Sequence, residues 1–279
     1  MRVIDIVNAP WVLEPRKHDQ LVAIYGAYVR GEKIDLAALE AQLGKPLASE
    51  KQGYDIVAGV AVVPVQGVIA KKMNLFSQIS GGASTQLIAR DLRQAAADPR
   101  VHAILLDIDS PGGSVDGTQA LADEVYAMRS GPKQIIAWAD GMMTSGAYWI
   151  GSAASKSYIS GDTVITGSIG VATQHVDVSK NNEKYGVTVT DVYAGKYKRI
   201  ASENKPLSEE GLAAMQEMVD AIYKVFVDAV ARNRGVDAET VLSNMADGRL
   251  FVGRAAIQAG LVDGVSTFDG AIESLLKPQ

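Results

Sequence analysis

The chain of 279 residues contains no cysteine, and its three histidines, His18, His102 and His175, are far apart in the sequence. Without cysteine there is no disulfide, no thiolate nucleophile and no cysteine-ligated zinc site. The histidines show no metal-ligand spacing such as the HExxH pattern. The sequence therefore predicts a protein that works without a bound metal ion or another cofactor.

A basic excess and a long hydrophobic run are also absent. The chain has 27 lysines and arginines against 32 aspartates and glutamates, a net charge of −5, which gives nucleic-acid binding no support. Its longest apolar stretch, residues 57–70, contains Pro64 and Gln66 and is shorter than the roughly 20 residues that span a bilayer. Asp5 and Asn8 interrupt the apolar residues at the start, so no signal peptide is predicted. We expect a cytoplasmic protein without a membrane span.

The sequence divides into an N-terminal extension, residues 1–53, and a main region, residues 54–279. In the extension, apolar residues at helical spacing predict helices at 18–30 and 35–43. In the main region, apolar runs alternate with helical patterns, which indicates an α/β domain with a parallel sheet covered by helices. The expected strands cover residues 57–69, 101–108, 134–138, 168–178 and 186–193, and the expected helices 84–97, 114–128, 145–154, 208–232, 237–244 and 253–258.

A glycine-rich turn, Ser110-Pro111-Gly112-Gly113, follows the predicted strand 101–108. Two glycines let the backbone approach a ligand with its N–H groups pointing outward. In an open parallel sheet, ligands bind beyond the carboxyl ends of the strands, where such N–H groups would hold an oxyanion. The alternative is a tight strand–helix turn that needs glycine for its geometry alone.

Ser145 follows the next strand and is surrounded by small residues, Gly146 and Ala147 among them. It falls at the start of a predicted helix, where free N–H groups and the helix dipole stabilise developing negative charge. These features suit a hydroxyl nucleophile. The alternative is a serine that only caps its helix, which is a common use of serine.

Lys198, in the segment Tyr193–Lys198, is the candidate base for Ser145. An ordinary lysine has a pKa of about 10.4, so a lysine base must be made neutral by burial and by neighbouring positive charge. Lys196 and Arg199 are close in sequence and offer such charge. The alternative is a solvated basic loop.

Four segments together resemble the signal peptide peptidase A family of serine peptidases, in the family's order and spacing, over residues 57–265. They are Asp109–Ser114, Ser145–Tyr148, Thr166–Val171 and Tyr193–Lys198. The resemblance implies a Clp/crotonase-like ββα-spiral core in residues 54–279, with the N-terminal helical extension and C-terminal helices added to it. It also implies a Ser–Lys dyad of Ser145 and Lys198, an oxyanion hole from Gly112, Gly113 and Gly146, a substrate strand added beside Gly113, and an oligomer. In this family the lysine can come from a neighbouring subunit.

In having no predicted membrane anchor, the sequence is similar to the capsid assembly proteases of tailed phages. That branch of the family implies a protein substrate, with capsid, portal or scaffold proteins as partners, and a location in the host cytoplasm or the assembling prohead. It also has a helical N-terminal extension, which residues 11–15 and the following predicted helix resemble. A cytoplasmic peptidase that degrades leftover peptides is the alternative within the family.

Three other readings of the residues stay open. A Ser–His–Asp triad would pair Ser145 with His175 and Asp177, although alternation along a strand puts the latter two on one face. A crotonase would use the glycine turn on an acyl-CoA thioester, but no basic site for the nucleotide phosphate is evident. A catalytically inactive subunit that binds scaffold proteins is the reading outside enzymes.

Overall fold

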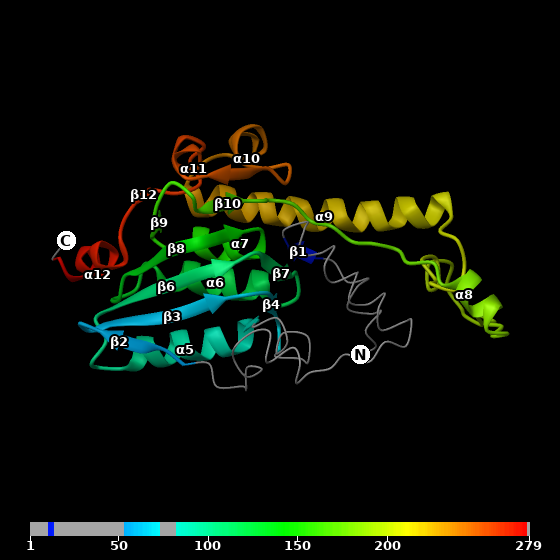
Figure 1. Cartoon of the computed structure of the whole chain (residues 1–279), viewed down its shortest axis with the longest axis horizontal. Helices are drawn as coiled ribbons and strands as arrows, with labels where there is room; N and C mark the ends of the chain where they lie inside the picture. Colours follow the sequence, from blue (N-terminus) through cyan, green and yellow to red (C-terminus); the bar gives the residue numbers. More distant parts are fainter. Residues whose placement is uncertain (1–10, 14–52, 73–81, 278–279) are drawn as a thin grey trace.

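An eight-stranded, mostly parallel sheet forms the centre of the molecule in the computed structural model, which describes residues 11–13, 53–72 and 82–277 (Figure 1). The order is β11-β10-β8-β6-β3-β2, with β9 paired to β8 and β12 paired to β9. The central strands β3, β6, β8 and β10 are parallel, which confirms the predicted α/β class. The strands are β2 (Asp55–Val57), β3 (Val60–Gln66), β6 (Ala103–Ser110), β8 (Ile135–Thr144), β9 (Lys156–Ile159), β10 (Ile165–Gly167), β11 (Leu250–Val252) and β12 (Gly264–Val265).

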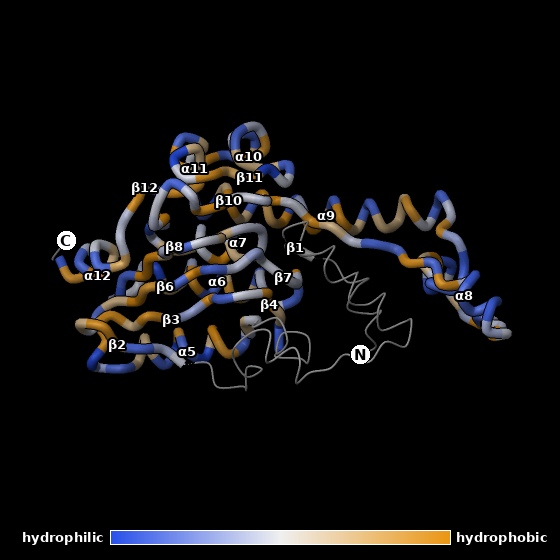
Figure 2. The backbone as a smooth tube through the Cα atoms, viewed as in Figure 1, coloured by the Kyte–Doolittle hydropathy of each residue, from blue (hydrophilic) through white to orange (hydrophobic). Residues whose placement is uncertain are grey.

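Both faces of this sheet are apolar. Successive side chains of a strand point to opposite sides, so a continuous apolar run supplies apolar residues to both faces. In β6, Ile104 and Leu106 belong to a larger core, while Leu105 belongs to a smaller one. Helices α5 (Thr85–Ala97), α6 (Thr118–Met128) and α7 (Gly146–Ser152) pack into the larger core, and α12 (Phe268–Leu276) covers the smaller. Figure 2 shows the apolar residues concentrated in these strands.

A second, smaller sheet lies beside the end of β6. Its order is β1-β7-β4-β5, formed by Trp11–Leu13, Gly112–Ser114, Ile69–Ala70 and Ala83–Ser84. Strand β1 runs antiparallel to β7, and β4 runs parallel to it. The N-terminal segment therefore reaches the glycine turn that follows β6.

The long helix α9 (Glu209–Arg234) extends well beyond the sheet (Figure 1). Ser208 caps its first turn, and Gly235, with φ 69°, ends it. Its C-terminal part is buried and includes Phe226, whereas its N-terminal part is exposed, with Leu212 at 59%. Residues 171–207, which we call the arm, contain α8 (Ser179–Lys184) and lie along and beyond the outer end of α9. The short helices α10 (Ala238–Asn244) and α11 (Arg254–Gln258) follow α9.

Several predicted elements differ from the structure. The expected strands at 168–178 and 186–193 are irregular, apart from a single bridge at residue 172. Most of the arm is exposed, and β-forming residues need a neighbouring strand and a packed face to form a sheet. The predicted extension 1–53, with its two helices, lies outside the described residues except for residue 53 and for residues 11–13, which form the strand β1. None of the helices in the described ranges is both long and apolar enough to cross a membrane.

Candidate active site

Ser145 occupies the turn between β8 and α7, where its backbone has φ 54° and ψ −120°. Glycine adopts this conformation readily, whereas a residue with a side chain is strained in it, by about 1–3 kcal/mol. The N–H of Ser145 donates to the carbonyl oxygen of Gly167 at 2.7 Å, which ties the turn to β10. The neighbouring strand therefore holds Ser145 in its strained conformation.

The side chain of Ser145 does not cap α7. Ser84 and Ser208 each accept a backbone N–H at the start of their own helices, whereas the side chain of Ser145 accepts none. Ser145 is only 1% exposed, and its Oγ has no hydrogen-bond partner within the described residues. A buried hydroxyl without a partner costs about 1–3 kcal/mol. The alternative in which Ser145 only caps its helix is therefore wrong.

The same turn occurs a second time, between β11 and α11. Gly253 has φ 55° and ψ −126° there, and a Cβ at this position would overlap the backbone of Asp162. At that turn the chain places glycine, which is the expected residue. At Ser145 it places a side chain in the same conformation and leaves the hydroxyl without a partner. Strain of this kind is typical of functional sites.

Two further buried hydroxyls lie next to Ser145. The Oγ1 atoms of Thr144 and Thr166 also have no hydrogen-bond partner in the part of the chain that the structure describes. Thr144 ends β8, and Thr166 lies on the adjacent strand β10, where Gly167 pairs with Thr144. Native proteins leave few buried polar groups unsatisfied. Three buried hydroxyls without a partner at neighbouring strand ends therefore mark this edge of the sheet as a candidate site.

The glycine turn lies at the same edge. Ser110 of β6 pairs with Met143 of β8, which brings the residues after β6 next to the residues after β8. The N–H of Gly112 donates to the Oγ of Ser110 at 3.1 Å, and a Cβ on Gly113 would overlap the backbone of Ile69 on β4. The geometry of the turn therefore requires glycine at 113 whether or not a ligand binds.

Gly146, the third predicted oxyanion donor, is the first residue of α7 and is buried. The first N–H groups of a helix have no acceptor within the helix. Helix α7 also packs against β7. The structure therefore brings Ser145, Gly146 and the glycine turn to the same edge of the sheet.

Lys198 is not brought to Ser145 within one chain. It is exposed on the arm, whose Ile200 lies beside Gly211 near the start of α9. Phe226, 15 residues further along α9, stacks on Trp149 of α7 with ring centroids 4.4 Å apart. At 1.5 Å per residue, those 15 residues rise about 22 Å. The base expected from the sequence therefore lies far from the serine of its own chain (Figure 1).

The two cations close to Lys198 in sequence, Lys196 and Arg199, are paired with acids. Lys196 forms an ion pair with Glu210, which raises the pKa of Lys196. Arg199 lies 2.9 Å from Asp191, and this pairing lowers the pKa of the Asp191 carboxyl. Within one chain, these pairs neutralise the positive charge that was expected to act on Lys198.

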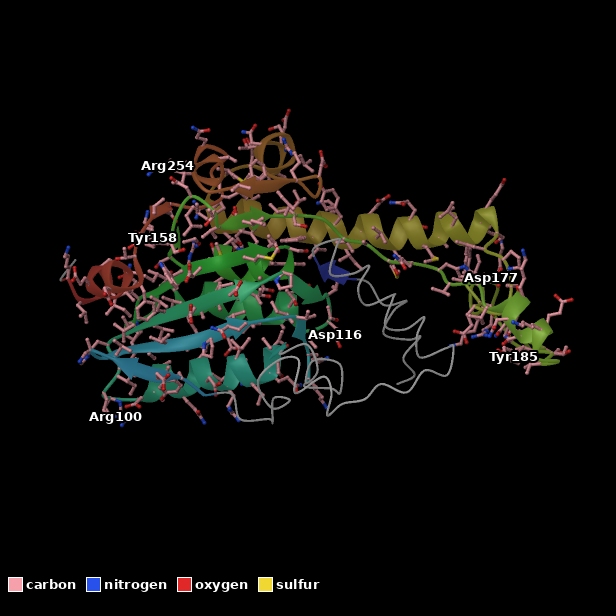
Figure 3. The ribbon with its side chains drawn as sticks, in the orientation of Figure 1. Arg100, Asp116, Tyr158, Asp177, Tyr185 and Arg254 are labelled. Carbon is pink, nitrogen blue, oxygen red and sulfur yellow. The ribbon has the colours of Figure 1, made fainter. Side chains whose placement is uncertain are left out.

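The residues of the alternative triad lie on the arm. The Nε2 atom of His175 lies 3.0 Å from the carbonyl oxygen of Ser202, and Asp177 accepts the N–H of Ser179. Figure 3 places Asp177 with Tyr185 at the far end of the arm. The structure therefore does not assemble a Ser–His–Asp triad within one chain. No group of histidine, aspartate or glutamate side chains in the described ranges is arranged to hold a metal ion.

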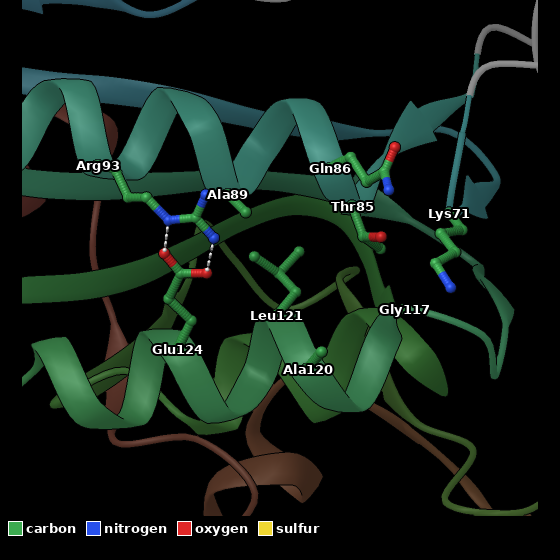
Figure 4. Close-up of a pocket in the computed structure, with 9 residues that line it drawn as sticks. All are labelled: Lys71, Thr85, Gln86, Ala89, Arg93, Gly117, Ala120, Leu121 and Glu124. Atoms are coloured by element: carbon green, nitrogen blue, oxygen red, sulfur yellow. Dashed lines mark hydrogen bonds and ion pairs between the residues drawn. The ribbon is translucent and has the colours of Figure 1, made fainter.

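Two grooves are relevant to the site. One, of about 370 Å³, is lined by Ser168 and Val171, which follow β10, and by Val219 and Tyr223 of α9. The other, of about 380 Å³, lies between α5 and α6 and contains none of the predicted site residues (Figure 4). Its Arg93 is engaged by Glu124 through two hydrogen bonds of 2.6 and 2.7 Å. The first groove also contains none of the predicted site residues, but its Ser168 directly follows Gly167, which accepts the N–H of Ser145.

Sequence reasoning missed two supporting groups. Ser110 holds the glycine turn, because its hydroxyl donates to the carbonyl oxygen of Gly67 at 2.6 Å and accepts the N–H of Gly112. Gly167 holds Ser145 through its carbonyl oxygen. The segment Thr166–Val171 was noted only as part of a family pattern. Its position after a strand, like that of Ser145, was the signal available in the sequence.

Comparisons with known proteins place the site in a family. Residues 127–278 match the model of peptidase family S49. The chain is 33% identical over 223 residues to capsid assembly protease C of Escherichia phage lambda, covering 80% of this chain and 50% of the relative. It is 30% identical over 277 residues to head-tail preconnector protein GP5 of Enterobacteria phage P21, covering 95% and 54%. It thus spans about half the length of these two relatives.

A relative of more similar length is the putative protease MJ0651 of Methanocaldococcus jannaschii, 34% identical over 262 residues, covering 91% of this chain and 78% of the relative. A solved structure of a ClpP1 mutant from Listeria monocytogenes is similar with a TM-score of 0.48 and 13% identity, covering 75% of this chain and 93% of that one. The family match spans more than half of the sequence and includes Ser145 and Lys198. The chain belongs to peptidase family S49.

Proposed function

We propose that this protein is a serine endopeptidase whose nucleophile is the hydroxyl of Ser145. The observation that carries the proposal is the Ser145 turn: a buried hydroxyl without a partner, in a backbone conformation that favours glycine. Family membership supports the same chemistry. Neither a helix cap nor a His175 triad explains this geometry.

The proposed reaction is hydrolysis of a peptide bond in two steps. The amine of Lys198 takes the proton of the Ser145 hydroxyl while Oγ attacks the peptide carbonyl carbon. The protonated lysine then gives its proton to the leaving amine, and an ester between Ser145 and the substrate remains. Water, deprotonated by the same lysine, attacks the ester; the lysine returns this proton to Oγ of Ser145 as the carboxylic acid product leaves. No cofactor enters this scheme.

The oxyanion formed in each step is assigned to the N–H groups of Gly113 and Gly146. Gly112 was the third candidate, but its N–H already donates to Ser110, so we assign it a role in shaping the turn. Helix α7, which begins at Gly146, adds the partial positive charge of its N-terminus. Loss of one such donor typically slows an enzyme by about 100- to 1000-fold.

We assign the base to Lys198 of a second copy of the chain. In its own chain, Lys198 is exposed and far from Ser145, and a lysine base needs burial to become neutral. The arm that carries it exposes large apolar side chains, with Val192 at 94% and Tyr197 at 60%. A second copy would cover them, and the groove beside Ser168 offers the arm a route to Ser145. The protein is therefore proposed to work as a homo-oligomer.

The proposed substrates are proteins of phage head assembly, such as capsid, portal or scaffold proteins. Two relatives are named as a capsid assembly protease and a head-tail preconnector protein, and the second aligns with 95% of this chain. The alternative, degradation of leftover signal peptides, rests on relatives named as signal peptide peptidases. Co-expression with capsid and scaffold candidates, followed by mass-spectrometric mapping of new termini, would decide between them. Cleavage of unfolded peptides alone would favour the alternative.

Single substitutions test the dyad. Ser145→Ala should lower peptide hydrolysis by at least about 1000-fold, since the nucleophile is lost, and circular dichroism should show an unchanged fold. Lys198→Ala should have a similar effect, whereas Lys196→Ala, the matched control on the same loop, should keep most of the activity. Hydrolysis by Ser145→Ala at the normal rate would refute the proposed function. A larger loss in Lys196→Ala than in Lys198→Ala would move the base to Lys196.

Mixing two inactive variants tests whether the base comes from a second copy. Ser145→Ala supplies an intact Lys198, and Lys198→Ala supplies an intact Ser145. If the dyad forms between copies, random co-assembly restores it at about one quarter of the sites, so a 1:1 mixture should recover about a quarter of the activity. If the dyad forms within one chain, the mixture should remain as inactive as its components. That result would refute the second-copy assignment and leave the nucleophile assignment standing.

A further inference from the structure

The strand β1 lies where a peptide substrate would add to the enzyme. Its residues pair antiparallel with β7 in a defined register, Trp11 with Ser114, Val12 with Gly113 and Leu13 with Gly112. Strand β7 carries Gly113 and packs against α7, which begins next to Ser145. The N-terminal segment of the chain is therefore paired with the strand that carries the proposed oxyanion donor.

Both edges of β7 are occupied in this arrangement. One edge pairs with β4, where Ile69 is opposite Gly113, and the other pairs with β1. An extended peptide binds a sheet through the free N–H and C=O groups of an edge strand. Strand β4 belongs to the folded body through Ile69, which is fully buried, whereas β1 belongs to a separate N-terminal stretch of the sequence. A substrate can therefore pair with β7 only when β1 leaves it.

We propose that residues 11–13 are an intramolecular ligand of the substrate strand, which a protein substrate must displace. The inference rests on the proposed peptidase function, and on the expectation from the family resemblance that the substrate adds as a strand beside Gly113. The ligand class is an extended peptide that adds antiparallel to Gly112–Ser114 through its main chain. Pro10 and Pro15 flank the segment in the sequence, and proline has no N–H to donate to a ladder. A short pairing of this kind is suited to displacement.

Disulfide trapping tests the position of β1 without relying on catalysis. The chain has no cysteine, so Trp11→Cys with Ser114→Cys introduces a single possible pair. Directly opposed residues on antiparallel strands have Cβ atoms about 4.5–5.5 Å apart, which is within reach of a disulfide after a small adjustment. In the full-length Ser145→Ala protein, this pair should oxidise at least about tenfold faster than the out-of-register pair Leu13→Cys with Ser114→Cys. Equal rates for the two pairs would refute the pairing of β1 with β7.

The consequence for catalysis is tested with Ser145 intact. Oxidising the 11–114 pair should abolish hydrolysis of an unrelated fluorogenic peptide, and reduction with dithiothreitol should restore it. Unchanged hydrolysis after complete oxidation would refute the inference. If the reduced protein and the wild type both lack hydrolysis that depends on Ser145, the proposed function fails instead. Register-specific trapping would in that case still support β1 as a ligand of β7.

Weakening the pairing should have the opposite effect. Alternate residues of an antiparallel strand donate across the ladder, so Trp11→Pro with Val12→Pro removes a donor whichever residue is engaged. If β1 is detached from β7 in about a tenth of the wild-type molecules and in nearly all molecules of this variant, kcat/KM should rise about tenfold. The matched control, Trp11→Ala with Val12→Ala, keeps both N–H groups and should gain less. A fall in kcat/KM in the proline variant, with an unchanged fold by circular dichroism, would count against displacement.

Discussion

Replacing Ser145 by glycine should stabilise the fold relative to replacing it by alanine. The backbone at φ 54° and ψ −120° costs a residue with a Cβ about 1–3 kcal/mol. Glycine avoids this strain but gives up about 0.5–1 kcal/mol, because it has more freedom in the unfolded chain. Both variants remove the hydroxyl, so the lack of a hydrogen-bond partner cancels from the comparison. We expect the glycine variant to be about 1 kcal/mol more stable.

Urea unfolding followed by circular dichroism measures this difference. With a slope of about 2–3 kcal/mol per molar urea, 1 kcal/mol moves the midpoint by about 0.3–0.5 M. Neither variant should hydrolyse peptide bonds, so self-digestion does not disturb the comparison. Against the wild type, Ser145→Ala should itself gain about 1 kcal/mol, since a buried hydroxyl without a partner is removed.

The second turn of this kind is the control. Gly253 has nearly the same backbone angles, and a Cβ there would also overlap the backbone of Asp162, so Gly253→Ala should lose about 2 kcal/mol or more. If the alanine variant at 145 is as stable as the glycine variant, Ser145 does not hold the strained conformation in solution. The reasoning that connects this strain to catalysis would then fail.

Two further predictions concern the body of the protein. Phe226→Ala should lower the free energy of unfolding by about 4 kcal/mol, because the buried ring stacks on Trp149, whereas Glu217→Ala, exposed on the same helix, should change it by less than about 0.5 kcal/mol. Thermal unfolding compares the two, and equal losses would show that α9 is not anchored through Phe226. Asp107→Asn should flatten the pH dependence of stability. Burial raises the pKa of the Asp107 carboxyl, so the folded state binds the proton more tightly than the unfolded state does. The stability of the wild type therefore falls as the pH rises from the ordinary pKa of about 3.9 through the raised pKa. Urea unfolding at several pH values across that window measures the slope, and an unchanged slope in the variant would exclude Asp107 as its source.

The elements that sequence analysis predicted well are those whose signal is local. The apolar run 101–108 became β6, and the helix expected from Ser84 begins at Thr85 with Ser84 as its cap. The expected strand 57–69 divides into three, because Ala58, Gly59 and Gly67 have positive φ angles. Three-residue strands such as β11 carry too little periodicity to be recognised. The strands predicted in the arm were wrong for the opposite reason: apart from the single bridge at residue 172, the arm has no strand partner among the described residues.

The residues of the candidate site also differ in whether a local sequence signal predicts them. Ser145 and the glycines could be predicted because each follows a strand, and parallel strands end at one edge of a sheet. Which N–H group is available could not be predicted, because the bond from Gly112 to Ser110 depends on the fold of the turn. The separation of Lys198 from Ser145 depends on the direction of α9, and no residue pattern encodes that direction. The pairing of β1 with β7 joins residues about a hundred positions apart, beyond the reach of any local signal.

The proposal that a second copy supplies Lys198 has a consequence for when the protein would be active. A solitary copy in dilute solution would hold its serine without a base, so turnover per chain should rise with protein concentration and then level off. Such an enzyme responds to crowding of its own copies. Gathering many copies into one small compartment would turn it on, and dispersal would turn it off, without any signal besides proximity.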